Sequence, residues 1–418
     1  MNVDWIEIEP MISNDKTIDA DVVIVGAGLS GAACAKRLVD AGYSTIIMYK
    51  KELPRHKICS GILSPRGHRF LIENFGPLPR KILFEPTSCR GVTFHFPGML
   101  SLPMDFHHGP TPHLHRRYSD FWAVEKSNAE IHDRTRFTGL KDRGRYVDLF
   151  AEKDEEPVRY RTKFVIGADG PVSPVTRSIY PDYPKMIPWF IVGQKLHGII
   201  ECPLSRDYFH FWFHPDLGHY TWSHERENRQ IVGVGFLRGD NFDRRHQRVT
   251  KYLEEKHNVK LEPAHESEAC LENFGPSLLN TYVFGKGNVI ITGQAAGFLN
   301  MMAEGMSCAL HSGAIAGEAV IESLNYNLPI QHTYRTMIQS EVGRCTDQWN
   351  PFKIIFSNPH EADFRKALKK HGAKDRIMIV KEIYKFIRLY APLKWGRKIL
   401  RQTAFKEIKG RYLTSGWL

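Results

Sequence analysis

Three glycines near the start of the chain have the spacing of a phosphate-binding loop. Gly26, Gly28 and Gly31 form a G-x-G-x-x-G pattern. In such a loop the first glycine permits a tight turn, the second lets a pyrophosphate approach the backbone, and the third lets the following helix pack closely. The amide groups at the start of that helix then face the phosphates. The pattern predicts a dinucleotide site, and a tight turn without a ligand is the alternative.

The residues around these glycines predict the elements that the loop requires. Residues 21–25 form a short apolar run that is typical of a parallel strand buried on both faces. Residues 32–41 have helical spacing, and the apolar run 45–48 completes a strand–helix–strand unit. Tyr49 stands at the end of this second strand, where an acidic residue normally binds the ribose hydroxyls. We therefore expect the Tyr49 hydroxyl, or the nearby Glu52, at the adenosine ribose.

The middle of the chain predicts a second sheet of a different kind. Aromatic and polar residues alternate in residues 208–213, and further strands are indicated at 220–222 and 230–236. Alternation with a period of two indicates antiparallel strands with one covered face. The aromatic side chains either wall an apolar substrate tunnel or fill the core. The candidates for substrate contact are Phe211, Phe213, Tyr220 and Trp222, with Phe209 on the same strand face as the first two.

Neither the cysteines nor the histidines predict a metal centre. The 7 cysteines are scattered and include no C-x-x-C pair, which argues against a disulfide framework and favours a reducing, cytoplasmic setting. His113 and His115 form an H-x-H pair, but no cysteine or carboxylate cluster accompanies them. The N-terminal residues lack a signal-peptide pattern, and no run approaches the roughly 20 apolar residues of a transmembrane helix. We expect no metal, and membrane contact only at the surface.

The positive charge of the chain lies in one segment. The 418 residues carry 57 Lys and Arg and 46 Asp and Glu, a net charge of +11, and residues 361–418 hold 16 of the basic and 5 of the acidic residues. Within this segment, residues 376–390 predict a cationic amphipathic helix, which is typical of binding to a membrane surface. Packing on the body of the protein and docking of an acidic electron carrier are the alternatives. Nucleic acid is disfavoured because no binding motif accompanies the charge.

Several segments together resemble the geranylgeranyl reductase family of FAD-dependent oxidoreductases. Residues 54–61 (PRHKICSG) are similar to the P-x-x-K-x-C-G-G motif of that family, with Ser60 in place of the first paired glycine. Residues 166–177 are similar to its second nucleotide motif, and residues 293–313 to its G-D-A-A-G…G-E-G segment. Shorter matches are Arg116 with Asp120, which fit an R-x-x-x-D element, and residues 220–222, which fit the start of a Y-x-W-x-F-P motif.

The resemblance implies an α/β fold. A Rossmann-type FAD-binding domain (residues 18–80, 112–188 and 281–330) would carry an inserted antiparallel β-sheet substrate domain (81–111 and 189–280) and a basic, helical C-terminal extension (331–418). The FAD contacts that it implies are Gly26, Gly28, Gly31, Tyr49, Ser60, Gly61, Arg116, Asp169, Gly170, Gly293, Gln294, Ala295, Gly297, Gly305 and Met306.

The resemblance also implies chemistry around the flavin ring. Cys59 is expected on the loop over the ring, with Lys57 nearby, either as a proton donor or as a small packing residue. The backbone amides of residues 305–307, at a helix start, are expected to stabilise the negative charge of the reduced flavin. Gln294 stands where the family has an aspartate. Loss of that carboxylate is expected to make the anionic, reduced flavin easier to form.

The resemblance predicts an FAD-dependent oxidoreductase that reduces carbon–carbon double bonds of an isoprenoid, a prenyl lipid or another apolar substrate. Flavin N5 would deliver hydride to one alkene carbon, and an acid would protonate the other. No second G-x-G-x-x-G pattern follows, so the electrons are expected from NAD(P)H, a ferredoxin or a flavodoxin. The alternatives are a flavin-dependent monooxygenase, a membrane-surface dehydrogenase that reduces quinone, and a flavoprotein that has lost its cofactor.

Overall fold

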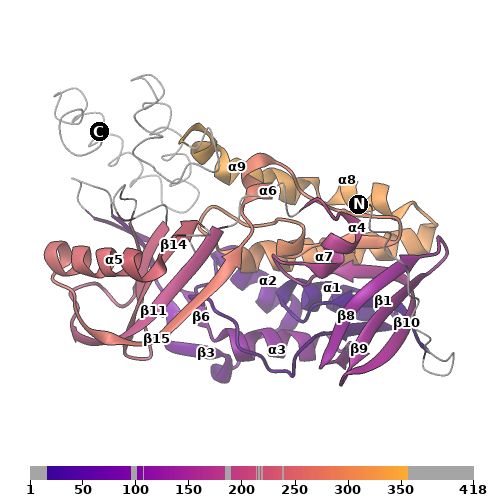
Figure 1. Cartoon of the computed structure of the whole chain (residues 1–418), viewed down its shortest axis with the longest axis horizontal. Coiled ribbons are helices and arrows are strands. Elements are labelled where there is room, and N and C mark those ends of the chain that lie inside the picture. The colour runs from indigo at the N-terminus through magenta and orange to yellow at the C-terminus, as the bar shows by residue number, and fades with distance from the viewer. Residues whose placement is uncertain are drawn as a thin grey trace, which may run out of the picture.

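Two sheets lie at opposite ends of an elongated molecule (Figure 1). The computed structural model describes residues 17–95, 101–106, 108–183, 190–212, 214, 217, 220–237 and 240–355, with the main chain alone at 102, 190, 220, 237 and 350–355. The amphipathic helix expected at 376–390 and the rest of the basic segment 361–418 lie outside the described residues.

The first sheet has a parallel core built around β1 (Thr17–Val25). β1 pairs in parallel with β10 (Glu156–Gly167) on one side and with β2 (Thr45–Met48) on the other. In the second half of β1, Val22, Val23 and Ile24 are fully buried, as the apolar run predicts. Parallel β7 (Glu130–His132) and β17 (Val289–Ile291) extend this core, and β8 (Thr135–Asp142), β9 (Val147–Lys153) and β16 (Gly285–Lys286) add antiparallel strands.

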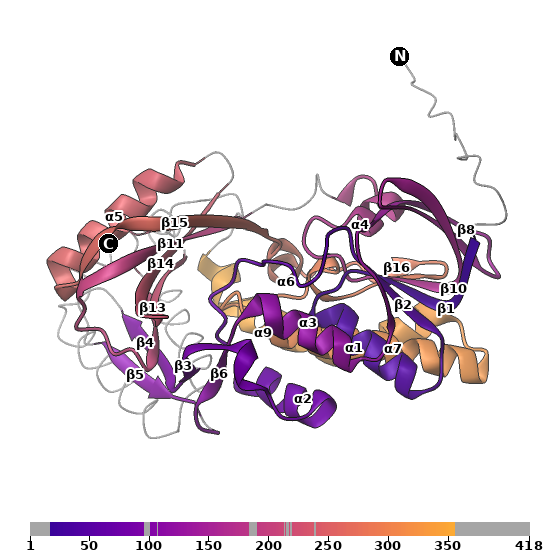
Figure 2. The ribbon, with the colours of Figure 1, turned by 90° about the horizontal axis from the view of Figure 1, so that it is seen from below.

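Two helices beside this sheet pack with their backbones in close contact. α1 (Leu29–Asp40) follows the glycine loop directly, and α7 (Gly305–Tyr326) runs beside it (Figures 1 and 2). A Cβ atom on Gly313 of α7 would lie 2.1 Å from the backbone oxygen of Ser30 in α1, so glycine is required there. The first turns of α7 therefore extend past the glycine loop. Other described helices are α2 (Pro65–Phe75), α3 (Arg116–Lys126), α4 (Pro174–Ile179), α6 (Gly275–Leu279), α8 (Ile330–Met337) and α9 (Gln339–Ile355).

The second sheet is antiparallel except where β12 (Tyr208–Trp212) pairs in parallel with β4 (Gly91–His95). Alternate residues of its strands face opposite sides, which is the period that the sequence predicts. Phe209 and Trp222 pack in one apolar cluster, whereas Trp212 and Val232 pack in another under α5 (Phe242–His257). The strands lie in the order β15 (Lys260–Glu272), β11 (Phe190–Glu201), β14 (Arg229–Leu237), β13 (Tyr220–Arg226), β12 (Tyr208–Trp212), β4 (Gly91–His95) and β5 (Leu102–Asp105).

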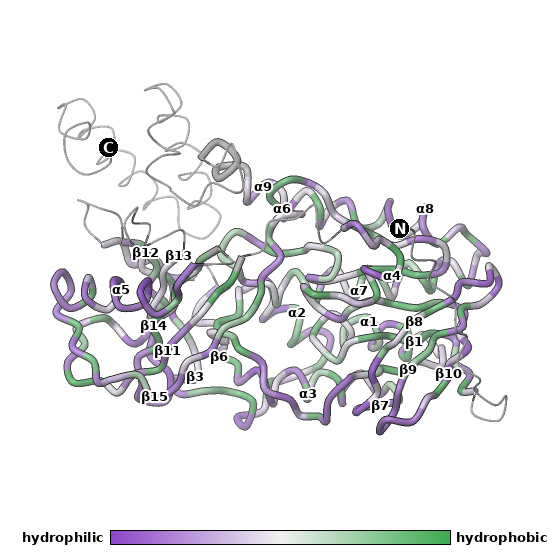
Figure 3. The backbone as a smooth tube through the Cα atoms, viewed as in Figure 1, coloured by the Kyte–Doolittle hydropathy of each residue, from purple (hydrophilic) through white to green (hydrophobic). Residues whose placement is uncertain are grey.

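The predicted fold class is confirmed: a parallel, helix-covered sheet is joined to a largely antiparallel sheet. A small antiparallel pair, β3 (Leu83–Cys89) and β6 (Thr111–Leu114), flanks β4 and β5 of the second sheet along the chain. Hydrophobic residues are concentrated in β1 and α1, whereas α5 is mostly hydrophilic (Figure 3). The exact domain boundaries stay a prediction. None of the described helices combines the length and the apolar character that a membrane span requires.

Candidate active site

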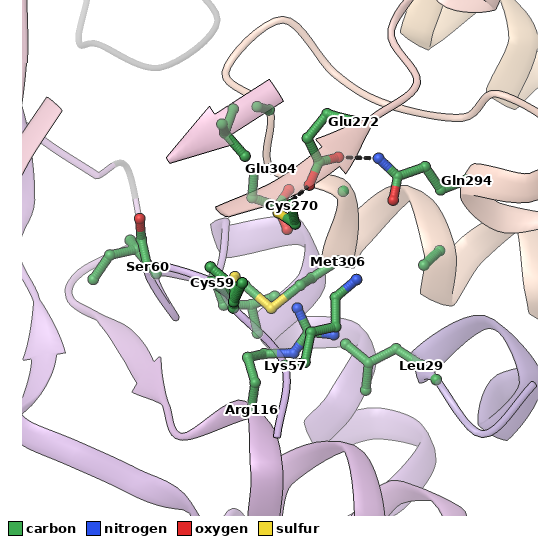
Figure 4. A pocket seen from close by; sticks show the side chains of 18 of the residues that line it. Leu29, Lys57, Cys59, Ser60, Arg116, Cys270, Glu272, Gln294, Glu304 and Met306 are labelled. Carbon is green, nitrogen blue, oxygen red and sulfur yellow. Dashed lines mark hydrogen bonds between the residues drawn. The ribbon is translucent and has the colours of Figure 1, made fainter. Parts of the chain in front are cut away.

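A cavity of about 350 Å³ lies where the two sheets meet. The glycine loop, the 55–64 loop, the end of β10 and the first turn of α7 contribute to one part of its wall. The inner face of the second sheet contributes the other part (Figure 4). The cavity is therefore lined on one part by a loop of the kind that binds nucleotides and on the other by an apolar sheet surface.

The three glycines of the loop have different structural roles. Gly26 has φ +124°, and a Cβ atom there would lie 2.3 Å from the backbone oxygen of Ala168. A Cβ atom on Gly31 would lie 2.0 Å from the oxygen of Gly26, so Gly31 serves helix packing and does not line the cavity. Gly28 is open, since a Cβ atom would meet only Arg55, at 3.8 Å. These positions agree with the tight turn, the close approach and the helix contact that the pattern predicts.

A buried cluster of two arginines and one aspartate lies beside this loop. Arg116 binds Asp120 through Nε and Nη2, at 2.7 and 2.9 Å, and Arg55 Nη2 donates to the same carboxylate at 2.8 Å. Burial alone would raise the pKa of Asp120, but the two guanidinium groups lower it to about 2. Arg55 Nη1 is buried, and no hydrogen-bond partner for it exists in the described part of the chain. Arg55 thus offers an unused cationic donor at the cavity wall.

Sequence reasoning missed Arg55, although it lies inside the 54–61 motif. Its guanidinium carbon lies 5.5 Å from the ring centre of Tyr49, which lines the cavity. Glu52, the alternative ribose ligand, is exposed and does not line the cavity. The end of β2 therefore presents an aromatic ring and a guanidinium to the cavity, and no carboxylate.

Asp169 and Gly170, two of the predicted FAD contacts, line the cavity at the end of β10. Asp169 Oδ2 accepts a hydrogen bond from the Val175 amide at 3.1 Å, which ties it to the start of α4. Asp169 Oδ1 is buried, without a hydrogen-bond partner among the residues that the structure describes. Burial raises the pKa of Asp169 to about 6, although hydrogen bonds from Ser173 and Val175 act to lower it. An orphaned carboxylate oxygen at the cavity wall is suited to accept hydrogen bonds from ligand hydroxyl groups.

The loop at residues 57–61 presents Lys57, Cys59 and Ser60 to the cavity. The Cys59 carbonyl accepts from Arg226 Nη1 at 3.3 Å, and the Ser60 carbonyl faces His113 Nε2 at 2.9 Å. Gly61 is not among the residues that line the cavity, and its contact with FAD stays a prediction. With φ +83° and a Cβ position 2.4 Å from the Leu114 oxygen, this glycine lets the loop lie against β6. His113 of the H-x-H pair therefore positions the loop, through contacts with two carbonyl groups.

The first turn of α7 lies at the cavity, and Gly305 and Met306, two of the predicted FAD contacts, are in its wall. Glu304 caps the helix, since its Oε1 accepts from the Ser307 amide at 2.8 Å and its other oxygen accepts from the Ser307 hydroxyl. Burial raises the pKa of Glu304 despite these bonds. The expectation that the Ser307 amide is free for a ligand is wrong, because this carboxylate already occupies it.

In the 293–313 segment Gln294 lines the cavity, but Gly293, Ala295 and Gly297, which are also predicted FAD contacts, do not. Gly293 has φ +61°, and its Cβ position lies 2.8 Å from Ser30 Oγ; that of Gly297 lies 2.2 Å from Pro276. Ala295 is buried in the core with 1% exposure. These three residues have packing roles in the structure, and their cofactor contacts stay a prediction. They are small because they bring the 293–297 turn against α1 and α6.

Two residues that no motif predicts lie beside Gln294. Gln294 Nε2 donates to Glu272 Oε2, and the Cys270 thiol donates to Glu272 Oε1 at 3.5 Å (Figure 4). Burial raises the pKa of Cys270, so this thiol keeps its proton. Cys270 and Glu272 both line the cavity, from the end of β15. Glu272 therefore places a carboxylate beside Gln294, the position at which the related family has an aspartate and this chain does not.

The apolar part of the cavity contains one of the four predicted substrate residues. Trp222 lines it, whereas Phe211 is 1% exposed and packs in the core against Phe94. Phe213 lies outside the described residues, and the structure describes only the main chain of Tyr220. Phe209, which the sequence places on the same strand face, also lines the cavity. Apolar lining residues that the prediction omits are Ile62, Val92, Phe94, Met104, Phe106, Val192 and Met302.

A buried polar group behind α7 joins three helices. The thiols of Cys308 and Cys345 lie 3.6 Å apart, and Glu341 completes a group with the spacing of metal ligands. Arg66 of α2 holds both oxygens of Glu341, at 2.9 and 2.6 Å. These contacts connect the start of α7 to α9 and α2. The scattered cysteine positions in the sequence contain no signal for this group.

No known family model matches the chain. The protein CbrA of Escherichia coli O1:K1 is 27% identical over 327 residues, which cover 72% of this chain and 81% of that protein. A geranylgeranyl bacteriochlorophyll reductase-like protein of Thermoplasma acidophilum aligns with a TM-score of 0.71 at 16% identity, covering 92% of this chain and 99% of that one. The chain has the fold of the FAD-dependent oxidoreductases. The same fold occurs in the myxobacterial chondrochloren halogenase CndH, with a TM-score of 0.68, 14% identity, and coverage of 90% and 91%.

Proposed function

We propose that this protein is an FAD-dependent oxidoreductase. The observation that carries the proposal is a pair of buried, unpartnered polar atoms, Arg55 Nη1 and Asp169 Oδ1, on residues that line the cavity. Arg55 lies beside the open Gly28, and the backbone of Asp169 lies beside Gly26. A donor with positive charge suits a pyrophosphate, and a carboxylate oxygen suits ribose or ribityl hydroxyls. Both atoms lack partners in the described residues, and a bound dinucleotide would satisfy both.

The residues that would hold FAD follow from this chemistry. Gly28 and Arg55 would bind the pyrophosphate, and the ring of Tyr49 would lie against the adenosine. Asp169 and Gln294 would bind hydroxyl groups between the pyrophosphate and the flavin ring. Bound FAD would supply hydride transfer at N5. The amides of Gly305 and Met306 would face the ring, because they lie in the wall of the cavity at the start of α7.

The second sheet supports an apolar substrate. Phe94, Met104, Phe209 and Trp222 belong to one apolar cluster and line the cavity. Such a surface excludes water from the reacting atoms and holds an alkene by contact rather than by hydrogen bonds. We propose that the substrate is an isoprenoid, a prenyl lipid or a similar apolar molecule whose carbon–carbon double bond is reduced.

Cys59 is the residue that we propose as proton donor to the substrate. Its thiol lies in the cavity wall, and its backbone is held in place by Arg226 and, through Ser60, by His113. Lys57 lies on the same loop, and its ammonium group would donate a proton to the Cys59 thiolate after turnover and regain one from solvent. The electrons would come from an external donor, NAD(P)H, a ferredoxin or a flavodoxin. Docking of that donor, or of a membrane surface, is the role proposed for residues 361–418.

A flavin-dependent monooxygenase is the second candidate function. It is favoured by the similarity to the halogenase CndH, whose TM-score of 0.68 is close to the 0.71 of the reductase-like protein. Anaerobic photoreduction of the FAD-bound protein, followed by a polyprenyl alkene in one cell and by oxygen in another, separates the two. The reductase is expected to reoxidise with the alkene. A flavin C4a-peroxide spectrum with oxygen and no reaction with the alkene would select the monooxygenase.

A further inference from the structure

Gln294 does not act alone at the cavity, because its amide is bound to a carboxylate from the other sheet. Gln294 Nε2 donates to Glu272 Oε2, although the two residues are 22 positions apart and belong to different parts of the fold. Because the amide nitrogen is held by Glu272, the Gln294 carbonyl oxygen is left as an acceptor. The pair thus presents acceptor oxygens, with one negative charge between them.

The surroundings of Glu272 leave this charge available to the cavity. Its other oxygen accepts a weak hydrogen bond from the Cys270 thiol, at 3.5 Å. No lysine or arginine forms an ion pair with Glu272 among the described residues, whereas Glu268 and Glu266 on the same strand each pair with a basic side chain. Glu272 and Gln294 line the cavity together with Asp169. A carboxylate held by neutral donors at a cavity wall is suited to bind ligand hydroxyl groups.

We propose that Glu272 supplies, from the second sheet, the carboxylate that position 294 lacks. This inference rests on the proposed FAD function. Glu272 and Gln294 together would accept hydrogen bonds from the hydroxyl groups of FAD, in place of a single aspartate at 294. The cofactor would then be bound by both sheets at once. The negative charge beside the flavin would then be retained. In that case the glutamine at 294 would not make the anionic, reduced flavin easier to form, in contrast to the expectation from the sequence.

The test compares four variants with the natural chain by FAD titration and by the flavin midpoint potential. Glu272→Gln is expected to weaken FAD binding by about 10- to 100-fold, which is the loss of hydrogen bonds to a charged group, and to raise the midpoint potential. The double variant Glu272→Gln/Gln294→Asp returns the carboxylate to position 294 and is expected to restore both values. Gln294→Asp alone places two carboxylates in contact and is expected to weaken binding. Glu266→Gln removes the same charge from an exposed position on β15 and is expected to change neither value.

The outcomes separate this inference from the proposed function. FAD affinity and potential that stay unchanged in Glu272→Gln would overturn the role of Glu272, as would a folded double variant that binds no better than the single one. Should Glu272→Gln fail to fold, the double variant carries the test: tight FAD binding supports the relocation, and weak binding in a folded protein overturns it. A natural chain that binds no FAD would contradict the proposed function itself.

Discussion

Replacing Arg55 with methionine tests the assignment of the pyrophosphate site. The variant keeps most of the apolar stem of the side chain and removes Nη1, which is buried at the cavity without a partner among the described residues. Hydrogen bonds to charged groups contribute about 1.5 to 3 kcal/mol. Loss of one such bond to the pyrophosphate corresponds to a rise in the FAD dissociation constant of about 10- to 150-fold.

The fold should survive this substitution. Asp120 loses the bond at 2.8 Å from Arg55 but keeps both bonds from Arg116, at 2.7 and 2.9 Å. Its charge therefore stays paired, and we expect the free energy of unfolding of the FAD-free protein to fall by only about 1 to 2 kcal/mol. Denaturant unfolding measures this change separately from FAD affinity.

The assay is a titration of FAD-free protein by flavin fluorescence, with Arg117→Met as the matched control. Arg117 is on the same helix as Arg116, but its side chain is exposed and contacts only Tyr118 among the ring contacts described, at 6.0 Å. The control is expected to bind FAD as the natural chain does. The reasoning fails if Arg55→Met is folded and its dissociation constant stays within about twofold of that of the control.

Four further substitutions test other parts of the site. Gly31→Ala is expected to lower the free energy of unfolding by at least about 2 kcal/mol, because its Cβ atom would lie 2.0 Å from the Gly26 oxygen. Gly28→Ala, whose Cβ atom has space, should fold normally and weaken FAD binding. Equal unfolding midpoints for the two variants would contradict this reasoning. Burial raises the pKa of Asp169 from 3.8 to about 6, so this group stabilises the FAD-free protein at low pH and loses that contribution as pH rises through 6. Asp169→Asn should therefore stabilise the FAD-free protein by about 2 kcal/mol at pH 8 but not at pH 3.5, and denaturant unfolding at both values checks it. Cys59→Ala should slow reoxidation of the reduced flavin by an alkene about 100-fold without changing FAD affinity, and an unchanged rate in rapid mixing would remove Cys59 as the proton donor.

The strand–helix–strand unit around the glycine loop could be predicted because all its information is local. The apolar run before Gly26 and the helical spacing after Gly31 define β1 and α1 within a short stretch of chain. The roles of the glycines outside this loop could not be predicted. Whether a glycine faces a ligand or a neighbouring backbone depends on what its Cβ atom would meet, and for Gly61 that neighbour is Leu114.

Long-range placement explains the remaining differences between prediction and structure. The side chains of Phe209 and Phe211 lie on the same face of β12, yet only Phe209 reaches the cavity. Phe211 does not, because it is covered by Phe94 of the parallel neighbour β4. Glu272 belongs to no motif and meets Gln294 only when the end of β15 reaches the first sheet. Periodicity identifies the covered face of a strand, but not the point along it at which a cavity opens.

The most direct test of the account is anaerobic reaction of the FAD-bound, photoreduced protein with a polyprenyl alkene. The account predicts that the flavin absorbance returns without oxygen, and that mass spectrometry of the lipid shows two added hydrogen atoms for each flavin reoxidised. A flavin that stays reduced in the presence of a panel of such alkenes, and reoxidises only when oxygen is admitted, would contradict the account.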